Sequence, residues 1–373
     1  MRRLVIGIGL ALVAACASAQ GNGKLQLHFI AVGQGMAALL VSPQGETVLF
    51  DDGVTKHCDL PVSYLQQLGV TKIDYHVNSH YHADHLGCAA QVLTEFPLQK
   101  TAFDRGTSIT SDAMNTASYQ NYVSTVGTKR RTPTKGETLT LDATSAHPVT
   151  ITFVTMNGNG VSTNNENDLS LVSLLHFDEF DAELGGDLSG ENTGNYADIE
   201  TTVIPLVHQV EVYEVHHHGS RYSSNDAYLA KIKPRLGIIS TGEGNTYHHP
   251  TKECLDRLHN AGITTYWTET GNGVTPDPDY DTVAGNIIIE VSPGSHEFTV
   301  TSTQAGVSPR TFPTWEANNA TSTGTPVVTY AWSKNSKVYH YSNCRYVQNI
   351  SPANLLTGTE PPPGKTLHKD CPK

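Results

Sequence analysis

The sequence predicts an α/β protein built from one large domain and a small C-terminal module. From Leu25 to about Thr303, short apolar strands broken by Gly and Asn turns alternate with helical segments such as 61–68 and 252–261. Several strands end in clusters of His or Asp, and this is where α/β folds place their binding sites. With 373 residues the chain is long enough to bury a sizeable core.

The first 19 residues have the plan of a signal peptide. Arg2 and Arg3 precede an apolar run that ends at Ala15, and residues 17–19 read Ala-Ser-Ala. The apolar run is too short to span a membrane comfortably. The same segment also fits a lipoprotein signal in which Cys16 would be lipidated. On either interpretation we expect an exported protein, secreted or periplasmic.

Cysteine count and charge give two further expectations. Five cysteines follow Cys16, and an oxidising compartment favours pairing, so we predict disulfides between Cys344 and Cys371 and between Cys58 and Cys88. The formal net charge of -12 argues against a surface that binds nucleic acid everywhere, but it leaves room for a local groove.

The expected organisation is a signal peptide (1–19), a large domain (25–303), a linker rich in Ser, Thr, Pro and Asn (304–333) and a small module (334–373). The module has six Lys or Arg against two acidic residues, which predicts either a nucleic-acid tether or a charged solvated tail. Its candidate ligands could hold zinc, unless the two cysteines pair with each other: His340, Cys344, His368 and Cys371.

The strongest motif is the run from His80 to His85, which reads His-Tyr-His-Ala-Asp-His and follows the predicted strand 73–77. Three imidazoles and a carboxylate in six residues are costly to bury unless they converge on a shared partner. On a strand-to-helix turn, His80 and His82 can face one metal ion while Asp84 and His85 face a second.

Acidic and histidine clusters elsewhere complete a metal site. Asp51 follows the predicted strand 47–50, Asp187 follows Gly185-Gly186, and three consecutive histidines occupy 216–218. A carboxylate between two divalent cations can bridge them, and Asp187 is the bridging candidate. A hydroxide held there would be a nucleophile at neutral pH. We expect two divalent ions, Zn²⁺ or alternatively Mn²⁺, because His-rich sites with carboxylates accept both.

The order of these motifs resembles the metallo-β-lactamase superfamily, and within it the hydrolase domain of ComEC-type competence proteins. The resemblance covers residues 25 to about 300 and includes the stretches 27–35, 80–87, 166–172, 186–189, 217–220, 222–225 and 245–250. It implies an αββα sandwich. The C-terminal tail resembles a small Ada-like Cys/His module found on secreted nucleases.

Carried over residue by residue, the resemblance assigns His80 and His82 to one metal and Asp84, His85 and His217 to the second, with His218 as the alternative to His217. Asp187 would bridge, and Asp51 would orient the site from behind. The β-lactamase-type enzymes have a histidine where this chain has Asn167 and Asp168. Ala31 and Met36 replace acidic residues usual in the competence proteins. Three further matches could bind an oxyanion or only form turns: Ser220, Asn245 and His249.

These expectations lead to three functional hypotheses. The first is a secreted phosphodiesterase that acts on nucleic acid, supported by the resemblance, the basic tail and the basic cluster 129–131. The second keeps the metals but hydrolyses a lactam, lactone or ester. The third is a surface binding protein without turnover. No transmembrane partner is implied.

Overall fold

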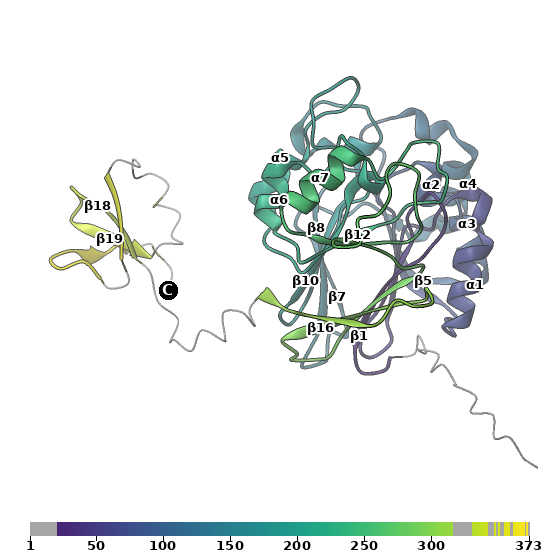
Figure 1. Cartoon of the computed structure of the whole chain (residues 1–373), viewed down its shortest axis with the longest axis horizontal. Helices are drawn as coiled ribbons and strands as arrows, with labels where there is room; N and C mark the ends of the chain where they lie inside the picture. The colour runs from purple at the N-terminus through teal and green to yellow at the C-terminus, as the bar shows by residue number, and fades with distance from the viewer. Residues whose placement is uncertain are drawn as a thin grey trace, which may run out of the picture. The chain divides into compact units, whose positions relative to one another are not determined.

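The computed structural model describes residues 21–315, 330–341, 347, 350, 354–358, 361–369 and 371 (Figure 1). The chain divides into two compact units, Met1–Ala317 and Asn318–Lys373. The predicted signal peptide and Cys16 lie outside the described residues. In the described part of the chain, no helix has both the length and the apolar character needed to cross a membrane.

Two sheets form the first unit. The nine-stranded sheet has the order β17-β16-β15-β1-β2-β3-β4-β5-β6. Its strands are β1 (Leu25–Phe29), β2 (Ala38–Val41), β3 (Thr47–Phe50), β4 (Ile73–Val77), β5 (Leu98–Phe103), β6 (Arg130–Arg131), β15 (Ile287–Val291), β16 (Glu297–Ser302) and β17 (Arg310–Pro313). The predicted strands at 47–50 and 73–77 are therefore confirmed.

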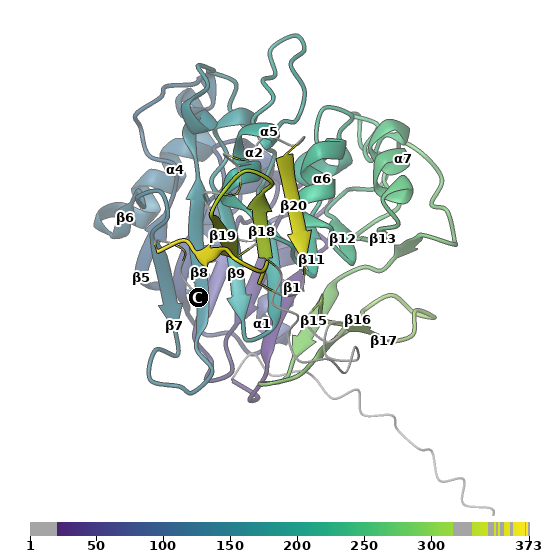
Figure 2. The same cartoon turned by 90° about the vertical axis from the view of Figure 1, so that its left-hand side faces the viewer.

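The eight-stranded sheet has the order β14-β13-β12-β11-β10-β9-β8-β7, and β7, β8 and β9 lie side by side in Figure 2. Its strands are β7 (Thr138–Leu141), β8 (Val149–Thr155), β9 (Val172–Phe177), β10 (Phe180–Leu184), β11 (Val212–Glu214), β12 (Leu236–Ile239), β13 (Thr264–Trp267) and β14 (Asp281–Val283).

Three apolar clusters define the layers. One lies between the sheets and joins Leu27 and Phe50 of the first to Ile151 and Phe177 of the second. A second packs helices on the outer face of the first sheet, and a third does the same on the second sheet (Figure 1). The helices are α1 (Asp59–Gln67), α2 (Ala83–Leu86), α3 (Ala89–Glu95), α4 (Ala117–Val126), α5 (Glu200–Val203), α6 (Asp226–Ile232) and α7 (Lys252–Asn260). This is the predicted αββα sandwich of the metallo-β-lactamase fold.

Parallel pairing brings several strand ends to one edge of the sandwich. In the first sheet β3 pairs with β4, and Phe50 is opposite Val77. In the second sheet β10, β11, β12 and β13 are mutually parallel. The polar residues that follow β3, β4, β10, β11 and β12 therefore meet at the carboxyl ends of their strands, as in other α/β sites.

The boundary between domain and linker differs from the sequence prediction of 303/304. Strand β17 lies inside the predicted linker and pairs with β16. Trp315 also donates its backbone N–H to Glu211 and its indole N–H to the carbonyl of Val210. The short β-strand 310–313 gave little periodicity, so the sequence alone did not reveal it.

The second unit contains a four-stranded sheet of order β20-β18-β19-β21 among its described residues. The strands are β18 (Tyr330–Ser333), β19 (Val338–Tyr341), β20 (Leu355–Gly358) and β21 (Thr366–Leu367). The module therefore begins by Tyr330, four residues before the predicted start at Lys334.

The predicted bond between Cys58 and Cys88 is present, with a sequence separation of 30. A closed loop of this length is expected to stabilise the fold by about 3–4 kcal/mol, because it restricts the unfolded chain. We expect the Cys58→Ser/Cys88→Ser variant to lose that much free energy of unfolding in urea titrations. Cys254→Ala, which removes a buried free thiol and no crosslink, serves as the control. A double variant as stable as the wild type would contradict the prediction.

Candidate metal centre

The motif from His80 to His85 lies on the turn between β4 and α2. His82 precedes the helix with extended backbone, and α2 carries Asp84 and His85. Two main-chain bonds hold α2 in place: Met36 donates to the carbonyl of Asp84 at 3.1 Å, and Asp52 donates to that of His85 at 2.6 Å. The turn is thus fixed to the loops after β1 and β3.

The donor atoms form two groups. His80, His82 and Asp187 make the first group, and Asp84, His85, His218 and Asp187 make the second, with the atoms of each group within 4.8 Å of one another. The two oxygens of Asp187 divide between them. Oδ2 lies 3.7 Å from Nε2 of His80, whereas Oδ1 lies 3.0 Å from Nε2 of His85 and 3.5 Å from Nε2 of His218.

The second group fits a cation by the direction of its lone pairs. His85 donates from Nδ1 to Asp51 at 2.7 Å, and His218 donates from Nδ1 to the carbonyl of Ser240 at 2.7 Å. When both rings are neutral the two Nε2 atoms carry lone pairs, and they face each other at 3.2 Å. Lone pairs so placed repel each other unless a positive charge lies between them.

Charges at the site favour the same conclusion. Burial lowers the pKa of His85, but Asp187 and Asp51 outweigh it and raise that pKa well above its ordinary value. Burial raises the pKa of Asp187, but His85, His218 and His217 hold it well below the usual range. Carboxylates that draw protons onto the histidines would equally attract a divalent cation, which replaces those protons.

The structure assigns His218, not His217, to the donor group of Asp84 and His85. Both residues have left-handed backbone, with φ of 53° and 57°, so their rings do not alternate as they would on a strand. His217 accepts from Nδ2 of Asn167 at 3.2 Å and lies 3.7 Å from Oδ2 of Asp187, outside both donor groups. His217 therefore lines the cleft beside the first group, which corrects its expected place at the second metal.

Asp51 occupies the predicted position behind the site. It accepts the backbone N–H of Ser79 at 2.7 Å and the amide of Asn78 at 3.0 Å, in addition to Nδ1 of His85. These bonds fix the carboxylate and, through it, the ring of His85.

We expect Asp51→Asn to weaken metal binding about 10- to 100-fold, because the ring of His85 loses the carboxylate that fixes its orientation. Competition with a chromogenic zinc chelator measures this affinity. Asp142→Asn, a buried carboxylate that bonds Ser42 and the backbone of Gln44, is the control. Equal zinc affinity in wild type and Asp51→Asn would rule out this role for Asp51.

The other predicted residues separate into two kinds. Ser220, His249 and Asn167 line a cleft of about 810 Å³ above the donor groups. Asp168 instead accepts from Thr163 and from the backbone of Ala197, and Asn245 bonds the backbone of Gly242 and His249. For Asn245 the turn-forming interpretation therefore fits the structure, while Asp168 joins the loops of Thr163 and Ala197.

The basic cluster 129–131 is tied to the fold by contacts of each of its side chains. Lys129 donates to the carbonyl of Leu98, Arg130 pairs with Asp104 at 2.6 Å, and Arg131 pairs with Glu137. The largely buried pair with Asp104 withdraws Arg130, so the cluster supports nucleic-acid binding less than its sequence suggests.

The chain is similar to a known protein family and to several named proteins. Residues 30–108 match the model of the metallo-β-lactamase superfamily. This stretch of the chain is that of a metallo-β-lactamase domain. Over 242 residues, 63% of the chain, it is 26% identical to Recombination protein 2 of Haemophilus influenzae and covers 26% of that protein. Over 267 residues, 66% of the chain, it is 23% identical to ComE operon protein 3 of Bacillus subtilis and covers 32% of it. The similarity is thus to ComEC-type competence proteins, of whose length the chain spans a quarter to a third.

A solved structure to which part of the chain is similar is MEM-A1, a subclass B3 metallo-β-lactamase from a soil metagenome library. It is 16% identical, with a TM-score of 0.37, and the match covers 66% of this chain and 91% of that one.

Two residues that support the metal site were not predicted from the sequence. Ser79 bonds Asp51 through its hydroxyl at 2.7 Å and lies 3.1 Å from Nδ1 of His80. Glu214 accepts the backbone N–H groups of Gly185 and Gly186 at 3.0 and 2.9 Å and so holds the turn before Asp187. A carboxylate within a strand as apolar as β11 is the signal that could have drawn attention to Glu214.

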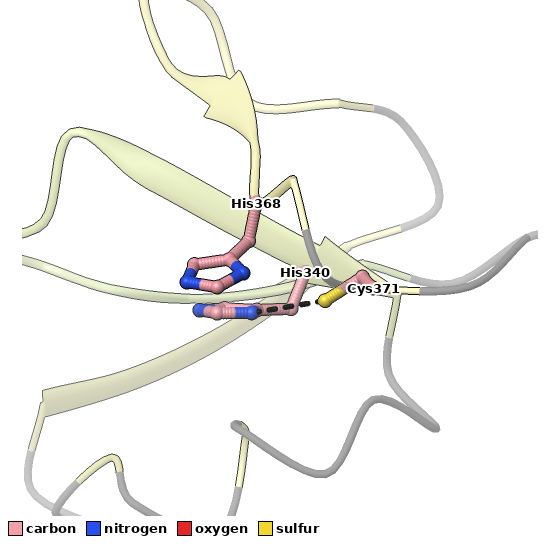
Figure 3. A group of neighbouring side chains, drawn as sticks. All are labelled: His340, His368 and Cys371. Carbon is pink, nitrogen blue, oxygen red and sulfur yellow. Dashed lines mark hydrogen bonds between the residues drawn. The ribbon is translucent and has the colours of Figure 1, made fainter.

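The candidate ligands of the C-terminal module lie partly outside the described residues. The rings of His340 and His368 stack at 5.0 Å, and His340 lies 3.2 Å from the sulfur of Cys371 (Figure 3). Cys371 is disulfide-bonded, which withdraws its thiolate from metal binding. Cys344, its predicted partner, lies outside the described residues.

Proposed function

We propose that the metallo-β-lactamase domain is a phosphodiesterase that cleaves nucleic acid with two divalent cations, zinc or manganese. The observation that carries the proposal is the division of the Asp187 carboxylate between two donor groups at the base of an open cleft. When bound, the ions would supply an activated water and stabilise charge on a transferred phosphoryl group. His80 and His82 would hold one ion, while Asp84, His85 and His218 would hold the other.

The walls of the cleft suit a nucleic-acid strand. Arg221 and Lys252 line it, and their acidic partners are exposed, so these surface ion pairs are weak competitors for a phosphate. Tyr196 and Tyr222 stack on each other with ring centroids 4.7 Å apart. One relative is named for recombination, a process that handles DNA.

Tyr247 is the most exposed aromatic residue of the cleft. Its side chain is 65% exposed and stacks on His249, with ring centroids 5.8 Å apart. A nucleobase could stack on the free face of such a ring.

We expect Tyr247→Ala to raise KM for a single-stranded oligonucleotide between about 5- and 150-fold with little change in kcat, because stacking on a base contributes about 1–3 kcal/mol. Steady-state kinetics on labelled oligonucleotides measure both constants. Tyr247→Phe keeps the ring and should match the wild type. A Tyr247→Phe defect as large as that of Tyr247→Ala would exclude stacking.

The test of the proposed function is hydrolysis of labelled single- and double-stranded DNA and RNA by the full chain loaded with zinc or manganese. Asp84→Ala is the inactive control, and removal of the ions with a chelator should abolish activity reversibly. Cleavage lost in both cases supports the proposal. Turnover of nitrocefin or an acyl lactone without any cleavage of nucleic acid would transfer the assignment to a lactam, lactone or ester substrate.

Export is part of the proposal. The first 19 residues suggest a signal peptide, and the Cys58–Cys88 disulfide suits an oxidising compartment. Fractionation of producing cells, with detection of the protein in medium or periplasm, tests this location.

A further inference from the structure

A second cleft, of about 610 Å³, lies at the opposite ends of the parallel strands. Strand β12 shows the separation. Ser240, just after its carboxyl end, accepts from His218 of the metal centre, whereas Arg235, just before its first residue, lines the second cleft. Four strand residues span about 13 Å, so the two clefts are distinct.

The second cleft is cationic in a chain with 36 acidic and 24 basic residues. Its lining includes Lys233, Arg235, Arg257 and Arg310, with Asp226 as the acidic member. None of the four cations forms a salt bridge within the described residues. The arginines that do so there are Arg105, Arg130, Arg131 and Arg221.

Arg257 and Arg235 are held by neutral backbone carbonyls rather than by salt bridges. Arg257 donates to the backbone carbonyls of Arg221, Ser223 and Ser224. Arg235 donates to the carbonyl of Thr314, while its buried Nε has no hydrogen-bond partner. The carboxylate that acts on Arg235 through space is Glu211, whose two oxygens accept the backbone N–H groups of Asp181 and Trp315.

Aromatic rings alternate with the guanidinium groups. The guanidinium of Arg235 lies 3.8 Å from the ring centroid of Trp315, and that of Arg310 lies 4.7 Å from the ring of Phe312. Lys233 and Arg257 lie at the carboxyl ends of α6 and α7, where a cation also offsets the helix dipole. That account does not extend to Arg235 and Arg310, which lie outside helices.

We propose that this cleft is a second binding site for single-stranded nucleic acid that works without the metal ions. Cationic side chains beside aromatic rings are the combination that single-strand binding proteins use for phosphates and bases. The inference takes its ligand class from the proposed function, because it places part of the substrate strand away from the bond that is cut.

The experiment measures fluorescence anisotropy of a labelled oligodeoxynucleotide with the full chain in EDTA. Lys233→Ala/Arg310→Ala removes two exposed cations, and Lys231→Ala, on α6 but outside the cleft lining, is the matched control. We expect the double variant to bind about tenfold more weakly, and its salt dependence, log Kd against log salt, to flatten by about 1.4. The control should bind like the wild type.

Unchanged affinity in the double variant, with thermal melting like that of the wild type, would overturn the second site. Equal affinity for inorganic polyphosphate and for the oligonucleotide would overturn its assignment to nucleic acid. The assay needs neither metal nor turnover, so it separates the two proposals. Binding at the cleft without cleavage of any nucleic acid contradicts the proposed function alone, whereas cleavage with unchanged binding in the double variant contradicts this inference alone.

Discussion

We expect the Asp187→Asn variant to lose both metal ions. We also expect its hydrolytic rate to fall by on the order of 10³-fold or more. The substitution removes the carboxylate whose two oxygens face the two donor groups, and it leaves an amide nitrogen that cannot act as a ligand. Even one lost electrostatic contact to a transition state costs about 10²- to 10³-fold, and here the ions that make such contacts are lost as well. Metal analysis of the purified protein and hydrolysis rates measure the two effects.

Asp181→Asn is the matched control for Asp187→Asn. Asp181 lies on β10, the strand that leads to Asp187, and it pairs with the surface histidines His176 and His208. Its substitution should leave metal content and rate unchanged. Full metal content in Asp187→Asn would show that the two groups bind their ions without a bridging residue.

Glu166→Ala is expected to destabilise the fold by about 3–5 kcal/mol, because it leaves the fully buried guanidinium of Arg105 without its carboxylate. Glu166 accepts from Nε of Arg105 at 2.7 Å and from Nη2 at 2.6 Å. It also accepts the backbone N–H of Tyr81 at 2.7 Å, so its loss should loosen the segment between His80 and His82. Urea unfolding with and without zinc measures both consequences.

Two comparisons distinguish the buried charge from a general effect of truncation. Glu137→Ala breaks the surface pair with Arg131 and should cost no more than about 1 kcal/mol. Glu166→Ala/Arg105→Met removes both charges and should recover part of the loss. A Glu166→Ala variant no less stable than Glu137→Ala would mean that water or a backbone group compensates Arg105.

The parts of the site that are continuous in sequence could be predicted from it. The motif from His80 to His85 forms one turn, so its spacing already fixes which residues share a face, and Asp187 follows a strand end that parallel pairing brings to the same edge. The choice between His217 and His218 could not be predicted. It depends on two successive left-handed residues, and no periodicity describes the direction of their side chains.

Charge patterns were harder to interpret than ligand motifs. The cluster 129–131 looks like a basic patch in sequence, yet its arginines pair with Asp104 and Glu137 once the chain folds. The cationic cleft is the reverse case, because it forms only when the chain folds. Its members Lys233 and Arg310 are 77 positions apart, and only the packing of β17 beside the end of α6 brings them to one cleft. Which carboxylate pairs with an arginine depends on the tertiary structure. Which distant cations become neighbours depends on it as well.

The Cys58–Cys88 bond bears on how the site captures an ion. Cys88 lies two residues beyond α2, while Cys58 follows the loop that leaves β3 after Asp51. The crosslink therefore ties the segment that carries Asp84 and His85 to the segment that carries Asp51, the carboxylate that orients His85. Part of the entropy cost of ordering the ligand-bearing segments is therefore incurred during oxidative folding, before any ion binds. In the reduced protein more of this ordering would have to accompany ion binding, although neither sulfur belongs to a donor group.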